Sequence, residues 1–190
     1  MTTLAPRRAG GAALAVLAAG LALSLAACSG GEKDTRACPH VEIVEDLSRL
    51  VKFRDGPGRD PSDVLYAARL DDAKSSCRYD KGGVTVDMTA TITGQRGRAG
   101  AKLPAGAVTY FVAITDGSKN IIAKRDFTSR LLFSDAGYAR LDDELEQRVP
   151  LPTPKPTDPL PTAGDHTIIL GFQLTPEQID FNEKQRKLER

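Results

Sequence analysis

The feature that most limits the fold is the ten-residue stretch VTVDMTATIT at residues 84–93. Its apolar side chains alternate strictly with Thr and Asp, so in an extended chain the two kinds point to opposite sides. This period of two predicts a strand with one buried and one solvated face. The residues expected on the buried face are Val84, Val86, Met88, Ala90 and Ile92.

Other segments also have the character of strands. Residues 107–115 are apolar on both faces, which predicts a central strand, and the turn sequence DGSKN leads from them into residues 121–133 as a hairpin. Residues 166–175 predict a strand with Ile168, Leu170 and Phe172 directed inward. Weaker strand signals cover residues 41–47, 64–70, 76–79 and 144–151.

This number of strands predicts a mostly β fold, namely an antiparallel β-sandwich of immunoglobulin-like architecture with a C-terminal α-helix. The chain has no tryptophan, and Cys38 precedes the first predicted strand, so only the architecture is predicted and not that family. Within the sandwich, residues 137–148 have a helical alternative, because Leu141 and Leu145 are four residues apart.

The C-terminal residues 175–190 carry the signals of a helix start. Thr175 and Gln178 have the spacing of a capping box, and Pro176 suits the first helical position. Acidic residues come early and basic residues late, as the helix dipole prefers. The apolar face is thin beyond Phe181, which favours a solvated terminal helix over one that docks a partner.

The N-terminus predicts export. Residues 1–27 contain two basic residues, no acidic residue and a long run of Ala, Leu, Val and Gly, which is typical of a secretory signal peptide. The run ends in Leu25-Ala26-Ala27-Cys28, which resembles the signal of bacterial lipoproteins. The resemblance implies cleavage before Cys28, a diacylglycerol thioether on its sulfur and a further acyl chain such as palmitate on its amino group. The alternative is an ordinary signal peptide in which Cys28 stands by chance.

A lipid on Cys28 would place the protein in the bacterial cell envelope, anchored to the membrane through its N-terminal lipid. No Asp follows the cysteine, which in a Gram-negative host implies the periplasmic face of the outer membrane. Residues 28–37 are polar and predict a flexible tether, and residues 38–174 predict the β-sandwich domain.

Removal of residues 1–27 leaves 24 Lys and Arg against 25 Asp and Glu, so the chain has no basic excess that would indicate nucleic-acid binding. No second apolar stretch is long enough to span a membrane.

Two cysteines remain, Cys38 and Cys77, and in an exported protein an isolated pair predicts a disulfide. Two alternatives remain open. The cysteines could be free thiols, or they could join His40 and His166 in a Cys2His2 zinc site, although the short paired spacings of such sites are missing.

Residues 150–161, PLPTPKPTDPLP, hold six prolines and predict a stiff, extended segment. It has two interpretations, a rigid crossover between strands or a docking strip for a partner formed by Pro152, Pro154 and Pro156.

Motifs of catalysis are absent from the sequence. It contains no Gly-x-Ser-x-Gly, no phosphate-binding loop and no His-Glu-x-x-His, and the acids of residues 53–63 match no calcium loop. We therefore expect a non-enzymatic envelope lipoprotein without a cofactor, which acts through contacts with an envelope protein in an assembly or accessory role. The alternative is a periplasmic module that binds a small ligand or a polymer.

Overall fold

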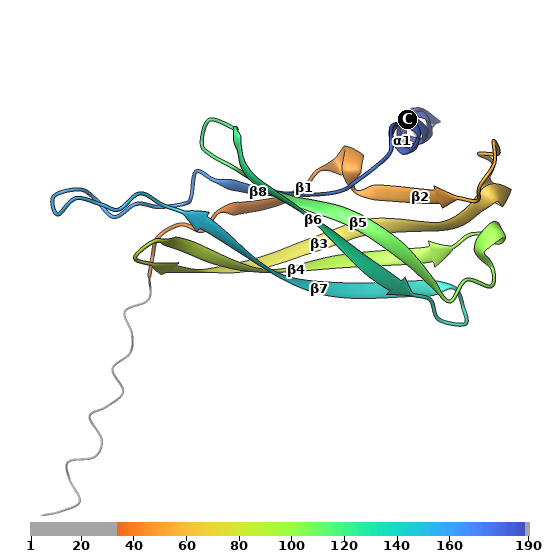
Figure 1. The fold of residues 1–190 in the computed structure, drawn as a ribbon, viewed down its shortest axis with the longest axis horizontal. Coiled ribbons are helices and arrows are strands. Elements are labelled where there is room, and N and C mark those ends of the chain that lie inside the picture. The colour runs from red at the N-terminus through yellow and green to blue at the C-terminus, as the bar shows by residue number, and fades with distance from the viewer. Residues whose placement is uncertain (1–33, 189–190) are drawn as a thin grey trace, which may run out of the picture. The chain divides into compact units, whose positions relative to one another are not determined.

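Two four-stranded sheets face each other in the computed structural model, which describes residues 34–188 (Figure 1). The first sheet has the strand order β1-β8-β5-β6 and the second has the order β2-β3-β4-β7. The strands are β1 (His40–Ile43), β2 (Arg49–Phe53), β3 (Val64–Asp80), β4 (Gly83–Arg96), β5 (Ala105–Thr115), β6 (Ile121–Leu132), β7 (Tyr138–Pro150) and β8 (Thr167–Phe172). A single α-helix in this part of the chain, α1 (Pro176–Leu188), follows β8, and short 3-10 turns occupy Glu45–Leu47, Pro61–Asp63 and Arg98–Gly100.

The core confirms the alternation in β4. Val84, Val86, Ala90 and Ile92 are completely buried, and Met88 is nearly so. The second sheet packs these side chains against the inward residues of the first, which include Ile168, Leu170 and Phe172 of β8 as predicted. Since each fully buried aliphatic or aromatic side chain stabilises by about 1.5–3 kcal/mol, this interface holds the two sheets together. The mostly β, two-layer fold with a C-terminal helix is therefore as expected.

Strand β3 is longer than the sequence pattern indicated. The two predicted strands at residues 64–70 and 76–79 are one strand of 17 residues, interrupted by a bulge between Leu70 and Asp72. An extra residue in a strand exchanges the side chains that point inward and outward. The inward and outward positions therefore exchange at the bulge, and the sequence pattern predicts two short strands where there is one.

Two other expectations are corrected. The helical alternative for residues 137–148 is wrong, because this segment lies in β7 and pairs with β4 along its length. Residues four apart lie on the same face in a strand as well as in a helix. The spacing of Leu141 and Leu145 therefore does not distinguish a strand from a helix. The predicted strand at residues 41–47 ends at Ile43, and the five-residue strand β2 that follows was not predicted.

The strand pairs are antiparallel except β1 and β8, which are parallel. The hairpin of β5 and β6 and the central place of β5, between β8 and β6, are as predicted. The arrangement is a sandwich of two sheets, and its immunoglobulin-like character stays a prediction.

Candidate functional site

The predicted lipid-attachment site, Cys28, lies outside the described residues. The chain enters the described part at Asp34 and is fastened at once to the end of β3. Cys38 and Cys77 form a disulfide with their Cα atoms 5.8 Å apart, which confirms the predicted pair. Because both sulfurs are used in this bond, the alternative zinc site and the free thiols are ruled out.

Tyr79 reinforces this attachment. Its hydroxyl donates to the carbonyl oxygen of Ala37 at 2.5 Å and accepts from the backbone N–H of Ala163 at 2.8 Å. The Arg36 guanidinium lies 3.8 Å from the centre of the Tyr79 ring and donates to the carbonyl of Pro161. The end of the tether, the end of β3 and the end of the proline-rich segment are therefore joined at one end of the sandwich (Figure 1).

The proline-rich segment leads from β7 to the loop before β8. Pro152 and Pro156 are exposed and Pro154 is half-buried. This path agrees with a crossover between the two sheets, and the docking role of these three prolines stays a prediction.

Inside the sandwich, a polar cluster links the two sheets. The hydroxyls of Tyr110 on β5 and Ser129 on β6 both donate to the carboxylate of Asp143 on β7, the former at 2.7 Å. Burial, and then the neighbouring carboxylate, raise the pKa of the Tyr110 phenol well above its usual value. The phenol thus stays protonated as a donor, and the cluster fixes β5, β6 and β7 relative to one another.

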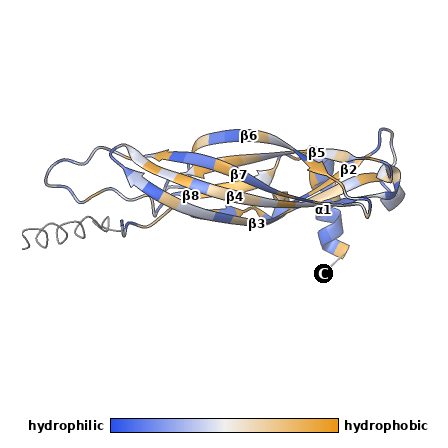
Figure 2. Cartoon of the chain, turned by 90° about the horizontal axis from the view of Figure 1, so that it is seen from below, coloured by the Kyte–Doolittle hydropathy of each residue, from blue (hydrophilic) through white to orange (hydrophobic). Residues whose placement is uncertain are grey.

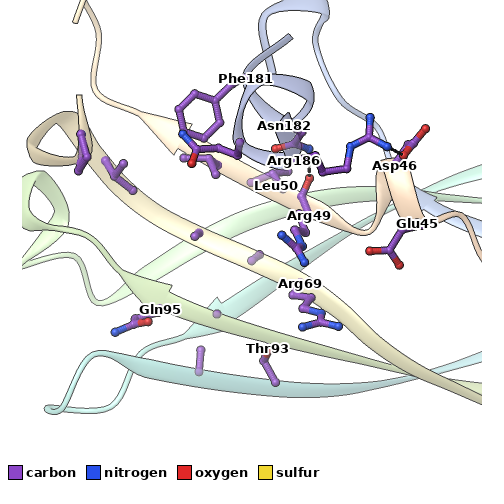
Figure 3. Close-up of a pocket in the computed structure, with 18 of the residues that line it drawn as sticks. Glu45, Asp46, Arg49, Leu50, Arg69, Thr93, Gln95, Phe181, Asn182 and Arg186 are labelled. Carbon is purple, nitrogen blue, oxygen red and sulfur yellow. Dashed lines mark hydrogen bonds and ion pairs between the residues drawn. The ribbon is translucent and has the colours of Figure 1, made fainter. Parts of the chain in front are cut away.

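The hollow best suited to a ligand or partner lies between α1 and the outer face of the second sheet, and we call it the groove (Figure 3). It has a volume of about 670 Å³. Its floor comes from β2, β3, β4 and β7, and its wall comes from α1. The floor includes Arg49, Val51, Ala67, Arg69, Thr93, Gln95 and Tyr138, and the wall includes Phe181, Asn182 and Arg186.

Helix α1 forms the wall because its start is fixed by the predicted capping box. The Thr175 backbone N–H donates to Oε1 of Gln178 at 2.9 Å, and the Gln178 backbone N–H donates to the Thr175 hydroxyl at 3.3 Å. The side-chain NH2 of Gln178 then donates to the carbonyl of Val51, and that of Asn182 donates to the carbonyl of Arg49.

These two carbonyls belong to β2, the edge strand of the second sheet. Four residues of a helix advance about 6.0 Å. Two residues of a strand advance about 6.8 Å, so the two amides match alternate carbonyls of β2. The helix therefore runs antiparallel to β2 and covers an edge that would otherwise be open to pairing with another strand.

Apart from these hydrogen bonds, α1 is held by few contacts. Phe181 packs edge-on against Phe53 with ring centres 5.1 Å apart, Arg59 pairs with Glu177, and Arg186 pairs with Asp46. No residue of α1 is buried and most of its surface is hydrophilic (Figure 2), so the predicted thin apolar face is confirmed.

The floor of the groove consists of two rows of side chains set by the strand register. The first row is Arg49, Arg69 and Thr93, and Arg140 continues this row on β7 outside the lining of the groove. The second row, two residues further along each strand, is Val51, Ala67, Gln95 and Tyr138. Figure 3 shows Arg49 and Arg69 with Arg186 at one end of the groove, and Phe181 and Gln95 at the other.

Acidic residues adjoin the arginine row. Nε of Arg69 lies 3.3 Å from the Asp71 carboxylate, which also accepts from the Thr93 hydroxyl. Nη2 of Arg140 lies 2.8 Å from Asp142. A hydrogen bond from Thr91, and then the Arg140 guanidinium, hold the pKa of Asp142 below its usual value. These acids reduce the repulsion between arginines placed opposite one another.

No sequence motif marked the groove. Its three arginines, Arg49, Arg69 and Arg186, are far apart in the sequence, and only the strand register and the position of α1 bring them together.

No family model, no curated protein and no solved structure matches this chain. Within residues 34–188, no helix is long and apolar enough to cross a membrane. In the same residues, no group of three or more His, Cys, Asp or Glu side chains is placed to hold a metal ion.

Replacement of both Cys38 and Cys77 by Ser is expected to lower the free energy of unfolding by about 4 kcal/mol, because the unfolded chain regains the freedom of a loop of about 40 residues. Urea unfolding of the wild type and the double variant measures this difference. Alkylation of the unreduced wild type should label neither cysteine, and labelling of either would contradict the assignment.

Replacement of Gln178 and Asn182 by Leu is expected to loosen α1. The two carbonyls of β2 lose their partners, at about 0.5–1.5 kcal/mol each. Amide hydrogen exchange of α1 should accelerate while exchange in β4 is unchanged. Gln185→Leu, at an exposed amide of the same helix, is the matched control and should leave exchange as in the wild type. Equal acceleration in both variants would mean that these two hydrogen bonds do not hold the helix.

Proposed function

We propose that this chain is a lipid-anchored, non-enzymatic module of the bacterial cell envelope that holds a protein partner in the groove. The observation that carries the proposal is the groove itself, an open hollow whose floor has one cationic and one largely apolar row of side chains. Apolar surface combined with a few placed polar groups is the chemistry of recognition.

The place of the groove supports this function. The tether reaches the sandwich beside Cys77, whereas the groove lies around Arg69 on the same strand. Eight residues of an extended strand cover about 27 Å, and the nine residues 29–37 of the predicted tether would add about 16 Å. A lipid on Cys28 would therefore hold the groove clear of the membrane surface, where a partner can reach it.

The openness of the groove favours a protein segment over a small molecule. Tyr138 on the floor is 60 % exposed, and the helix bounds the hollow along the edge strand β2. Small-ligand sites normally enclose 70–90 % of their ligand, which an open hollow of this kind does not do. The volume, which lies within the usual range of about 300–1,000 Å³ for such sites, is the one observation that favours the small-ligand alternative.

The anchor is tested with Cys28→Ala in the full chain. We expect the wild type to incorporate labelled palmitate and to sediment with membranes, and the variant to do neither, because the thiol must accept the diacylglycerol before the chain is cleaved and its new amino group is acylated. Replacement of Cys38 and Cys77 by Ala should leave the lipid in place. A Cys28→Ala protein that is bound to membranes as strongly as the wild type would refute the anchor.

The groove is tested by photo-crosslinking in intact cells. A photoreactive phenylalanine analogue in place of Tyr138 should give a discrete adduct with another protein, because this side chain is exposed on the floor of the groove. The same analogue at Arg78, on the outer face of β3 but outside the groove, is the control and should give none. Identical adducts from both positions, or none from Tyr138, would count against the groove as the binding site.

A further inference from the structure

We infer that the partner segment that fits the groove is an extended peptide with a carboxylate side chain and an apolar side chain two residues apart. This inference rests on the proposed function and names the chemistry of its partner. It follows from the two rows of the floor, one cationic and one largely apolar, and from the direction of the helical wall.

The position of α1 sets the direction in which a bound segment runs. Because Gln178 and Asn182 bind alternate carbonyls of β2, the helix axis follows the strand direction along the edge of the sheet. A segment lying between this wall and the floor therefore also runs along the strands. In an extended peptide, side chains on one face repeat every two residues, about 6.8 Å apart.

The two rows of the floor have the same spacing. Arg69 and Ala67 are two residues apart on β3, and their partners Arg49 and Val51 are two residues apart on β2. A peptide that places one side chain over the Arg49–Arg69 pair thus places the next side chain of that face over Val51 and Ala67. Phe181 lines the same hollow from the wall.

The cationic position suits a carboxylate. Guanidinium groups bind carboxylates through two parallel hydrogen bonds, and here Arg49 and Arg69 are directly opposed in the register, with Arg186 above them.

The ion pairs of Arg69 and Arg186 leave both guanidinium groups accessible to an incoming carboxylate. The side chain of Arg69 is 57 % exposed although it contacts Asp71, and that of Arg186 is 36 % exposed although it contacts Asp46. Exposed pairs of this kind contribute about 0–1 kcal/mol, so an incoming carboxylate can share or replace them at little cost. They also keep the guanidinium groups close to the floor.

The balance of charge favours one carboxylate over a polyanion. Residues 28–190 carry 24 basic and 25 acidic residues, so no broad positive field surrounds the groove. Asp71 and Asp142, which contact the arginine row, would repel a run of phosphates or of acidic residues. A single Asp or Glu beside an apolar residue needs no broad positive field and meets this repulsion at one position only.

The test is selection from a phage-displayed library of random dodecapeptides. The full chain in lipid nanodiscs is the target, and empty nanodiscs serve as the counter-selection. We expect enrichment of Asp or Glu followed two residues later by Leu, Ile or Phe. Selection on Arg69→Gln should lose the acidic residue, whereas Arg78→Gln should keep it. Arg78 is the matched control because it lies on the same face of the same strand, outside the groove, and also pairs with an aspartate.

Affinity measurements make the test quantitative. By fluorescence polarisation, changing Glu to Gln in the selected peptide should weaken binding about tenfold to the wild type. The same change should have little effect on binding to Arg69→Gln, because the peptide carboxylate then no longer has the Arg69 guanidinium as its partner. Circular dichroism confirms that each variant is folded.

Several results would overturn the inference. Enrichment of basic or purely apolar peptides, or no enrichment at all, would do so. Binding of dodecanoate that depends on Arg69, with no peptide selected, would assign the groove to a small amphiphile instead. If the crosslink from Tyr138 is obtained but no acidic peptide is selected, the proposed function stands and only this inference fails. If acidic peptides are selected but no crosslink forms in cells, the inference stands and the proposed function fails.

Discussion

The antiparallel ladder between β3 and β4 is the interaction on which the rest of the structure depends. It runs from the pair Tyr66 and Arg96 to the pair Asp80 and Gly83, and it serves both faces of the second sheet. The inward side chains of β4 form the centre of the core, while the outward side chains of both strands form the middle of the groove floor. A slip of one residue would send the core residues into water and the polar rows into the core, so the core fixes the register of the groove. At the turn, Gly83 has a φ of +150°, and a Cβ there would lie 2.3 Å from the carbonyl oxygen of Val149, so only glycine suits this position.

The bulge in β3 decides which side chains of this strand lie on the outer face of the sheet. Arg69 and Arg78 are an odd number of residues apart and would point to opposite faces of a regular strand. The extra residue between Leu70 and Asp72 places both on the outer face and leaves Asp71 beside Arg69. A bulge that aims side chains in this way is a common device next to binding sites.

Local signals in the sequence predicted much of the fold. The alternation in β4, the hairpin of β5 and β6, the capping box of α1 and the pairing of Cys38 with Cys77 each depend on residues whose own pattern is sufficient. The groove could not be predicted in this way. Arg49 lies in a strand of five residues that shows no clear alternation, the bulge hides the continuity of β3, and α1 meets β2 through two amides that any solvated helix could carry. The groove depends on how distant segments pair, and the residue pattern of one segment does not predict its register with another.

The fastening of the N-terminal segment to β3 also decides how the domain responds to force. Strand β1 has only four residues and pairs with β8 alone, so a pull on Asp34 without the disulfide would unzip it one hydrogen bond at a time. With Cys38 bonded to Cys77, the same pull reaches the end of β3, which is hydrogen-bonded to β4 from Tyr66 to Asp80. The load then acts along the strand and must shear many hydrogen bonds together. Since survival under force is governed by the unfolding rate, the covalent link would make the domain resist a pull applied through its N-terminal segment.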